Sequence, residues 1–222
     1  MATAKKFFDW SYGKRGENVK QLAKGEMKSM EKMFLDFLAH EPAFISYGSA
    51  GLNASVKGVG FIPKDEYLEE VLEIYLEHIK TYKEGDKTYG ERGLKILIDQ
   101  LYSEEAREKI DFTRLVTLEL AKKQSWTNYH ENPEACLIFN QPPVVSYKLK
   151  GKIAIYDEKA SGKREIYQQI INAQHDMYHT PNGIDKWIDK PAYVFTIEEV
   201  YDNSATKAGF GTKLEYPYSD EK

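Results

Sequence analysis

Two lysines, a glutamine and a serine form the most chemically suggestive cluster of this 222-residue chain: Lys122, Lys123, Gln124 and Ser125. They stand where an apolar, strand-like segment gives way to a short polar segment with helical character. Ammonium groups, a hydroxyl and the free N–H groups of a helix N-terminus are donors that bind phosphate. The cluster therefore predicts a site for a phosphorylated ligand, with Ser125 as the helix cap. A solvated basic turn is the alternative.

A second pattern involves two histidines. His175 and His179 are four residues apart, which places both imidazoles on one face of a helix. Two imidazoles at this spacing can bind a transition metal. No His-Glu-x-x-His arrangement and no neighbouring cysteine completes a ligand set, so we expect no metal site. The sequence also lacks a glycine-rich phosphate loop and a Gly-x-Ser-x-Gly nucleophile turn.

The first half of the chain must supply helices and one hairpin around these residues. Apolar positions at helical spacing predict an amphipathic helix over residues 19–39, with Asn18 as its N-cap. Residues 43–49 and 54–62 read as the two strands of a hairpin whose turn is marked by Gly51 and Asn53. Residues 64–110 then change to helical patterning. We expect helices near residues 67–79 and 94–101, a loop over 81–92 and a short third helix capped by Ser103.

The second half is dominated by strand patterns. We expect strands at residues 112–121, 135–140, 145–156 and 192–200, and a helix at 164–178. Six short strands with long excursions favour a closed or nearly closed antiparallel barrel, because closure removes exposed edges. The predicted fold is therefore a mainly β, α+β domain spanning residues 1–222. It is a split antiparallel barrel of about six strands with an N-terminal helix and a helical insertion at 64–110. We expect the insertion to serve packing or dimerisation, with a lid as the alternative.

Composition narrows the classes of function. Lysine and arginine total 31 against 35 acidic residues, for a net charge of −4, which argues against a general nucleic-acid binder. The single cysteine, Cys136, lies in an apolar run and excludes an intramolecular disulfide; we expect it to be buried. The first residues have no apolar secretory core, and no run reaches the roughly 18 apolar residues of a membrane span. A cytoplasmic protein is the expectation.

Four segments together resemble the pyridoxamine-phosphate-oxidase-like family of FMN-binding split barrels. Residues 37–61 are similar to its opening helix and first hairpin, and residues 125–139 to its short helix with Asn-Pro leading into a strand. Residues 147–155 are similar to its basic strand with a central glycine, and residues 191–197 to its closing strand. The order and spacing of these pieces carry the resemblance, which covers about two-thirds of the chain.

This resemblance implies FMN as cofactor, held at the interface of a homodimer, and an oxidoreductase acting on a small substrate or an electron carrier. It implies that Lys57 contacts the phosphate. Thr117 is our choice over Arg114 as the cofactor-facing residue of its strand, because the two point to opposite faces. The Gln141 amide could bond a flavin carbonyl or simply close a turn. Lys148, which shares a strand face with Lys150, could contact the cofactor or face solvent.

No catalytic acid or base stands out in the sequence. Two other readings use the same barrel. One is a non-catalytic protein that binds flavin, deazaflavin or haem, and a haem version would use the His175/His179 pair. The other is a cofactor-free structural dimer.

Overall fold

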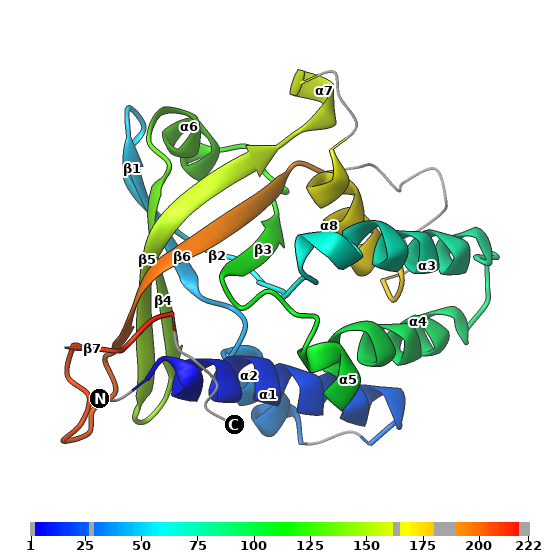
Figure 1. Ribbon diagram of the computed structural model, residues 1–222, viewed down its shortest axis with the longest axis horizontal. Helices are drawn as coiled ribbons and strands as arrows, with labels where there is room; N and C mark the ends of the chain where they lie inside the picture. Colours follow the sequence, from blue (N-terminus) through cyan, green and yellow to red (C-terminus); the bar gives the residue numbers. More distant parts are fainter. Residues whose placement is uncertain (1–2, 27–28, 162–164, 180–189, 218–222) are drawn as a thin grey trace.

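A computed structural model describes residues 3–26, 29–161, 165–179 and 190–217 of the chain. Seven strands form one antiparallel sheet, and helices cover one side of it (Figure 1). The strands are β1 Ala43–Gly48, β2 Gly51–Val56, β3 Arg114–Leu118, β4 Glu134–Gln141, β5 Val145–Tyr156, β6 Ala192–Asp202 and β7 Thr212–Lys213. The α+β class and the barrel of about six main strands are confirmed.

The sheet has the strand order β2-β1-β4-β5-β6-β3, with the short β7 paired to β6. The chain leaving β2 then crosses to β3, where the Gly60 N–H donates to Val116 O over 2.8 Å and the Val116 N–H donates to Gly60 O over 3.0 Å. This bridge joins the two ends of the strand order. The bridge closes the barrel along a short length only. Elsewhere the strands are not joined into a closed barrel and face the helices.

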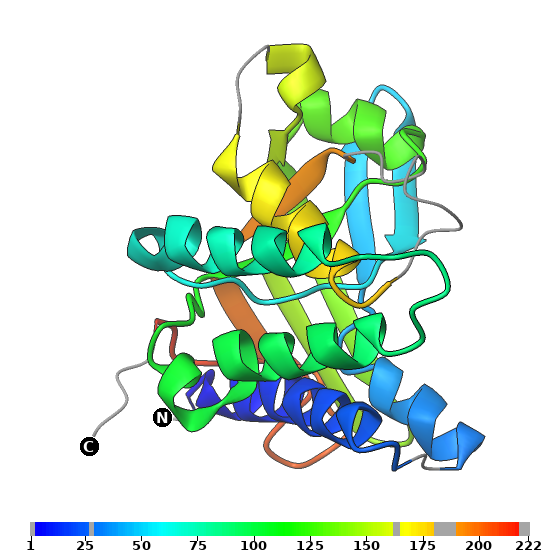
Figure 2. The same cartoon turned by 90° about the vertical axis from the view of Figure 1, so that its right-hand side faces the viewer.

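Most of the helices form a layer beside the barrel (Figure 2). The helices of the described residues are α1 Lys5–Ala23, α2 Met30–Phe37, α3 Leu68–Lys80, α4 Tyr89–Leu97, α5 Glu104–Arg107, α6 Gln124–Glu131, α7 Glu158–Ser161 and α8 Ile166–Asp176, with a π turn at Ile98–Tyr102. Helix α6 lies apart from the layer and packs on β1 and β2. Helix α3 packs against α8, and α4 against α1. The insertion at 64–110 is therefore helical, as predicted, and it packs within the molecule.

The predicted helix over residues 19–39 is wrong in its extent. Helix α1 begins at Lys5 and already ends at Ala23, so Asn18 lies inside it rather than at its start. Gly25 takes a φ of +67°, a backbone conformation that favours glycine and stops the helix. A separate helix, α2, begins after Ser29, whose hydroxyl accepts a hydrogen bond from the Lys32 N–H.

Other predicted element boundaries also differ from those in the structure. The hairpin is confirmed, but its turn is Ser49–Ala50: Gly51, with a φ of +83°, opens β2, and Asn53 lies within that strand. Helix α4 begins at Tyr89, inside the expected loop. Ser103 caps α5 as predicted, accepting from the Ala106 N–H over 3.0 Å. The start of the predicted helix at 164–178 falls outside the described residues, which give α8 from Ile166.

Aromatic side chains fill the end of the barrel that faces α1. Phe7 on α1 packs edge-on against Phe139 of β4 and Tyr147 of β5, with ring centroids 5.1 and 5.3 Å apart. Helix α1 thereby closes one end of the barrel.

In the described part of the chain, no helix is long and apolar enough to cross a membrane.

Candidate functional site

A cavity of about 670 Å³ lies between the barrel and the helical layer. One wall is residues 55–60, the end of β2 and the chain beyond it, and a second is residues 116–118 of β3. Helix α1 contributes Arg15, and the insertion contributes Leu97 and Tyr102. The last wall is α8 with the turn after it. The cavity is thus assembled from segments far apart in the sequence, and the helical insertion forms part of it.

Two of the predicted site residues, Lys57 and Thr117, line this cavity. Thr117 is buried on β3. Arg114 belongs to a different cluster, where it binds Asp65 and Asp111. The Lys57 ammonium donates to Glu119 Oε2 over 2.8 Å and lies 5.5 Å from the centre of the Tyr193 ring. Lys57 therefore reaches the cavity with its charge already paired.

Glu119 occupies the turn where the sequence predicted a phosphate. Its carboxylate is 2 % exposed, and Oε1 accepts from the Ala121 and Lys122 N–H groups over 2.8 and 2.7 Å. Burial raises the pKa of Glu119, but the hydrogen bonds from Lys57 and the two N–H groups outweigh it, so the pKa lies below its ordinary value. An ionised carboxylate thus accepts from the Lys57 ammonium and from the Ala121 and Lys122 N–H groups, and it places a negative charge beside the predicted phosphate site.

The four residues of the predicted cluster lie outside the cavity lining. The Lys122 ammonium donates to Asp157 Oδ2 over 3.0 Å, and Lys123 and Gln124 are exposed. Lys123 holds the N-cap position of α6 without a side-chain cap. Ser125 is therefore not the cap. It is buried within the helix, where its hydroxyl accepts from Asn53 Nδ2 over 2.7 Å.

The remaining two predicted residues lie elsewhere. Gln141 joins helices to the barrel: its Oε1 accepts from Trp10 Nε1 over 3.1 Å, and its Nε2 donates to Leu35 O over 2.7 Å. The Lys148 ammonium lies 4.3 Å from the centre of the Tyr201 ring, a cross-strand partner on β6. Both side chains have structural partners, and neither lines the cavity.

The cavity instead contains basic and neutral nitrogen groups that sequence reasoning did not combine. They are Arg15, His40, His175 and His179. The rings of His175 and His179 lie with their centroids 4.7 Å apart, as their spacing indicated. His175 Nδ1 lies 2.9 Å from Asp176 Oδ1, which orients that ring. The spacing of the histidine pair was the one sequence signal that pointed to these cavity residues. Arg15 gave no such signal, because it precedes the helix predicted over residues 19–39.

His40 is the most deeply buried of these groups. It is 7 % exposed, and its Nδ1 is a buried atom without a hydrogen-bond partner among the residues that the structure describes. Burial, reinforced by the positive charge of Arg15, lowers the pKa of His40 to about 3. Burial also lowers the pKa of His179, with the charges of His175 and Arg15 acting in the same direction. Both rings are held neutral near pH 7.

The histidine pair does not extend to a metal centre. Within residues 3–26, 29–161, 165–179 and 190–217, no group of three or more histidine, cysteine or acidic side chains is arranged to hold an ion.

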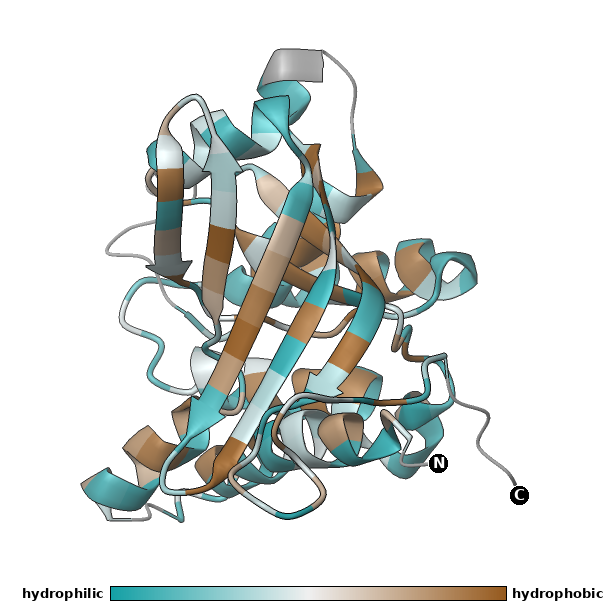
Figure 3. Ribbon diagram, turned by 90° about the vertical axis from the view of Figure 1, so that its left-hand side faces the viewer, coloured by the Kyte–Doolittle hydropathy of each residue, from teal (hydrophilic) through white to brown (hydrophobic). Residues whose placement is uncertain are grey.

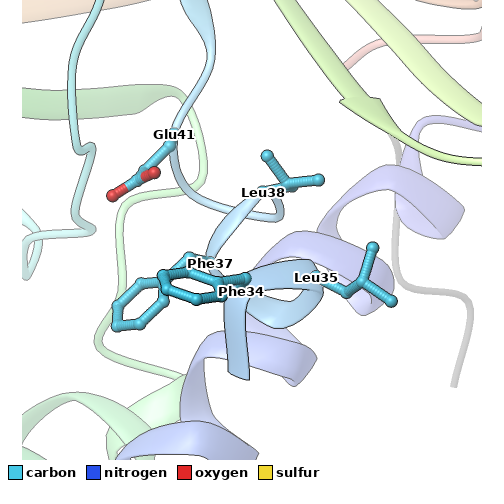
Figure 4. A pocket seen from close by; sticks show the side chains of 5 residues that line it. All are labelled: Phe34, Leu35, Phe37, Leu38 and Glu41. Atoms are coloured by element: carbon cyan, nitrogen blue, oxygen red, sulfur yellow. The ribbon is translucent and has the colours of Figure 1, made fainter. Parts of the chain in front are cut away.

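A second, shallower pocket of about 390 Å³ lies on α2 and the residues after it. The rings of Phe34 and Phe37 lie next to each other there, while Leu35 points away from them (Figure 4). Phe37 and Glu41 line both pockets. The rim of the main cavity therefore continues into an apolar surface on α2.

Comparison with known proteins gives similarity in structure alone. No family model and no curated protein matches the sequence. Solved structures with a similar backbone trace include pyridoxamine-phosphate-oxidase-like and FMN-binding proteins, the group that the sequence resembles.

Three of these structures illustrate the level of likeness. A protein related to general stress protein 26 (pyridoxinephosphate oxidase family) from Clostridium acetobutylicum is 15 % identical, with a TM-score of 0.42 over 84 % of this chain and 93 % of that one. An FMN-binding protein from Syntrophomonas wolfei is 9 % identical, with a TM-score of 0.41 over 85 % and 99 %. HupZ from Group A Streptococcus is 10 % identical, with a TM-score of 0.43 over 85 % and 100 %.

Proposed function

We propose that this chain is an FMN-dependent oxidoreductase that binds its cofactor in the cavity between the barrel and the helical layer. The observation that carries the proposal is the cavity itself. Its volume of about 670 Å³ lies within the roughly 300–1,000 Å³ of pockets that bury small ligands. The wall includes the cation of Arg15 and the predicted residues Lys57 and Thr117.

The donor set fits a planar, anionic ligand. Tyr102, His175, Tyr178 and His179 supply flat rings to the cavity, and residues 58–60 supply backbone without large side chains at Gly58 and Gly60. Glu119 accepts from the Lys122 N–H and places a buried carboxylate next to the turn at Lys122–Ser125, which disfavours a phosphate there. The flavin would supply the electron or hydride transfer, and the protein would bind it, orient it and limit the access of water.

We also propose that two copies of the chain associate through the outer surface of the sheet. Outward-facing positions of β1, β2 and β4 are apolar side by side, since Ala43 pairs with Val56 and Ile138, Ile45 with Ala54 and Cys136, and Tyr47 with Leu52. We call these eight residues the outer apolar face; brown bands mark much of it (Figure 3). Tyr47, Leu52 and Val56 are 65, 76 and 68 % exposed. A contiguous exposed apolar surface of this kind is typical of an interface.

The absorption spectrum of the purified protein tests the cofactor. We expect the bands of oxidised flavin after loading with FMN, bleached by a reductant and restored by air or by an electron acceptor. Bound flavin that never cycles would favour the non-catalytic binding protein, and a Soret band would favour haem. Failure of FMN, riboflavin and haem to bind would contradict the proposed function.

A further inference from the structure

The cavity lining includes one arginine, Arg15. Lys57 is paired with Glu119, and no acidic side chain of the described residues lies within ion-pair distance of Arg15. Arg15 lies close enough to act on three groups of the cavity. Its charge adds to the effect of burial in lowering the pKa of His40 and His179, and it partly opposes the burial that raises the pKa of Tyr102 to about 12. The positive field inside the cavity is therefore centred on Arg15.

The histidine pair lies within the reach of that field. His175 and His179 follow one another along one side of the helix end, and both line the cavity with Arg15. Asp176 holds His175 through Nδ1, which leaves Nε2 as the free ring nitrogen. Besides Asp176, acidic side chains near these groups include Glu41, which is exposed and lines the same cavity, and Glu26, which is exposed and lines a neighbouring pocket with Arg15. Guanidinium and imidazole N–H groups are suited to an oxyanion.

His40 adds a buried imidazole to the cavity lining. Leaving a buried polar atom without a hydrogen-bond partner is unfavourable. His40 Nδ1 is such an atom, and the residue lines the same cavity as Arg15. Gln174 Oε1, from a residue that also lines the cavity, is another such atom.

We propose that Arg15, His175 and His179 form an anion subsite that holds the phosphate, or an oxyanion of similar charge, of the ligand in the cavity. The proposal rests on the proposed function for the identity of that ligand. It places the anionic end at the helical wall, on the opposite side from the turn that the sequence indicated. Glu119 explains the choice, since its carboxylate would repel a phosphate at the turn.

Inorganic phosphate tests the subsite without any flavin. We expect a titration at constant ionic strength to shift the imidazole NMR signals of His175 and His179 in a saturable way, while chloride leaves them in place. Arg15→Gln should weaken this binding about tenfold or more, and Arg15→Lys should retain part of it. The double variant His175→Gln/His179→Gln, followed by calorimetry, gives a second route if Arg15→Gln fails to fold. Absence of a saturable shift in the wild type would overturn the proposal.

A pair of flavins tests the same subsite within the proposed function. FMN and riboflavin share one ring system and differ by the phosphate monoester. We expect FMN to bind more tightly than riboflavin, and Arg15→Gln to remove this preference by lowering the affinity for FMN much more than that for riboflavin. The matched controls are Lys122→Gln and Lys123→Gln, which should keep the preference.

The outcomes separate the two proposals. If neither flavin binds but phosphate still shifts His175 and His179 in an Arg15-dependent way, the flavin assignment is wrong and the anion subsite holds. If FMN binds and its preference over riboflavin depends on Lys122 or Lys123 instead of Arg15, the flavin assignment holds and the subsite is wrong.

Discussion

Glu119 shows how a single side chain changes the chemistry of a site. Its carboxylate accepts from the Lys57 ammonium and from the N–H groups of Ala121 and Lys122. Of these three residues, Lys57 and Lys122 were predicted to contact the phosphate. Glu119 and Lys57 are 62 residues apart in the chain. The residue types at the turn were visible in the sequence, but the partner that satisfies them was fixed only when β2 and β3 came together.

His40 should make stability depend on pH. Its folded-state pKa of about 3 is below the value of about 6.5 expected in the unfolded chain, so the unfolded state binds more protons between these values. The free energy of unfolding should therefore fall as the pH is lowered from about 6.5 toward 3. His40 alone contributes up to about 1.4 kcal/mol per pH unit. Urea unfolding of the protein without ligand, at a series of pH values, measures this slope.

A variant separates His40 from the other titrating groups. His40→Phe should reduce the slope between pH 6 and pH 4, whatever its effect on stability at pH 7. His130→Gln, which replaces an exposed histidine of α6, serves as the matched control. Equal slopes for His40→Phe and the wild type would contradict the assignment.

At the scale of elements, the helical layer is held by a close approach of three helices. The Met177 carbonyl, just beyond α8, lies 3.1 Å from His78 Nε2 of α3. A Cβ atom built on Gly93 of α4 would lie 1.9 Å from the same carbonyl oxygen. Glycine is thus required at position 93 because the backbone of another element takes the space of a side chain.

Substitution at this contact should loosen the layer. Gly93→Ala forces α4 away from α8, and we expect it to lower the free energy of unfolding by about 1–3 kcal/mol or more. Gly13→Ala is the matched control: Gly13 lies in α1 with nothing within 4 Å of the added atom, so alanine should stabilise by about 0.5–1 kcal/mol. Urea unfolding of both variants measures the difference. Wild-type stability of Gly93→Ala would show that the contact is not as tight as described.

The elements differed in how well the sequence predicted them. Strand β5 was predicted to the residue, because its alternation of apolar and lysine positions matches the two faces of a strand. Helix α1 was missed over residues 5–18, where aromatic residues that fill the barrel replace a simple amphipathic stripe. The packing of a side chain such as Phe7 depends on Phe139 and Tyr147, which lie more than a hundred residues away in the chain.

At the scale of the whole molecule, the two surfaces of the sheet have different roles. The inner surface meets α1, α6 and the helical layer, and the outer apolar face is left to solvent in a single copy of the chain. Lys148 and Lys150 of β5 border it, paired across the strands with Ile138 and Cys136. Cys136 is therefore only partly buried, against our expectation, and lies on this face.

Association through the outer apolar face should be sensitive to one charge. We expect the wild type to sediment as a dimer and Leu52→Asp to sediment as a monomer, because a carboxylate buried in an apolar interface lacks a partner. Phe210→Asp is the control. It removes an equally exposed apolar side chain from the loop before β7, and should leave the dimer intact. A wild type that remains monomeric at high micromolar concentration would rule out this interface.

The sequence by itself determined the order of most elements, the antiparallel barrel and the helical nature of the insertion. These follow from periodicity and turn residues, which act over a few neighbouring positions. The tertiary structure alone decided the site. Arg15, His40, Lys57 and the histidine pair meet only because α1, the strand end after β2 and α8 face one cavity. Charge pairing depends on distance in space, so no local pattern could reveal that Glu119 neutralises Lys57 while Arg15 keeps its charge.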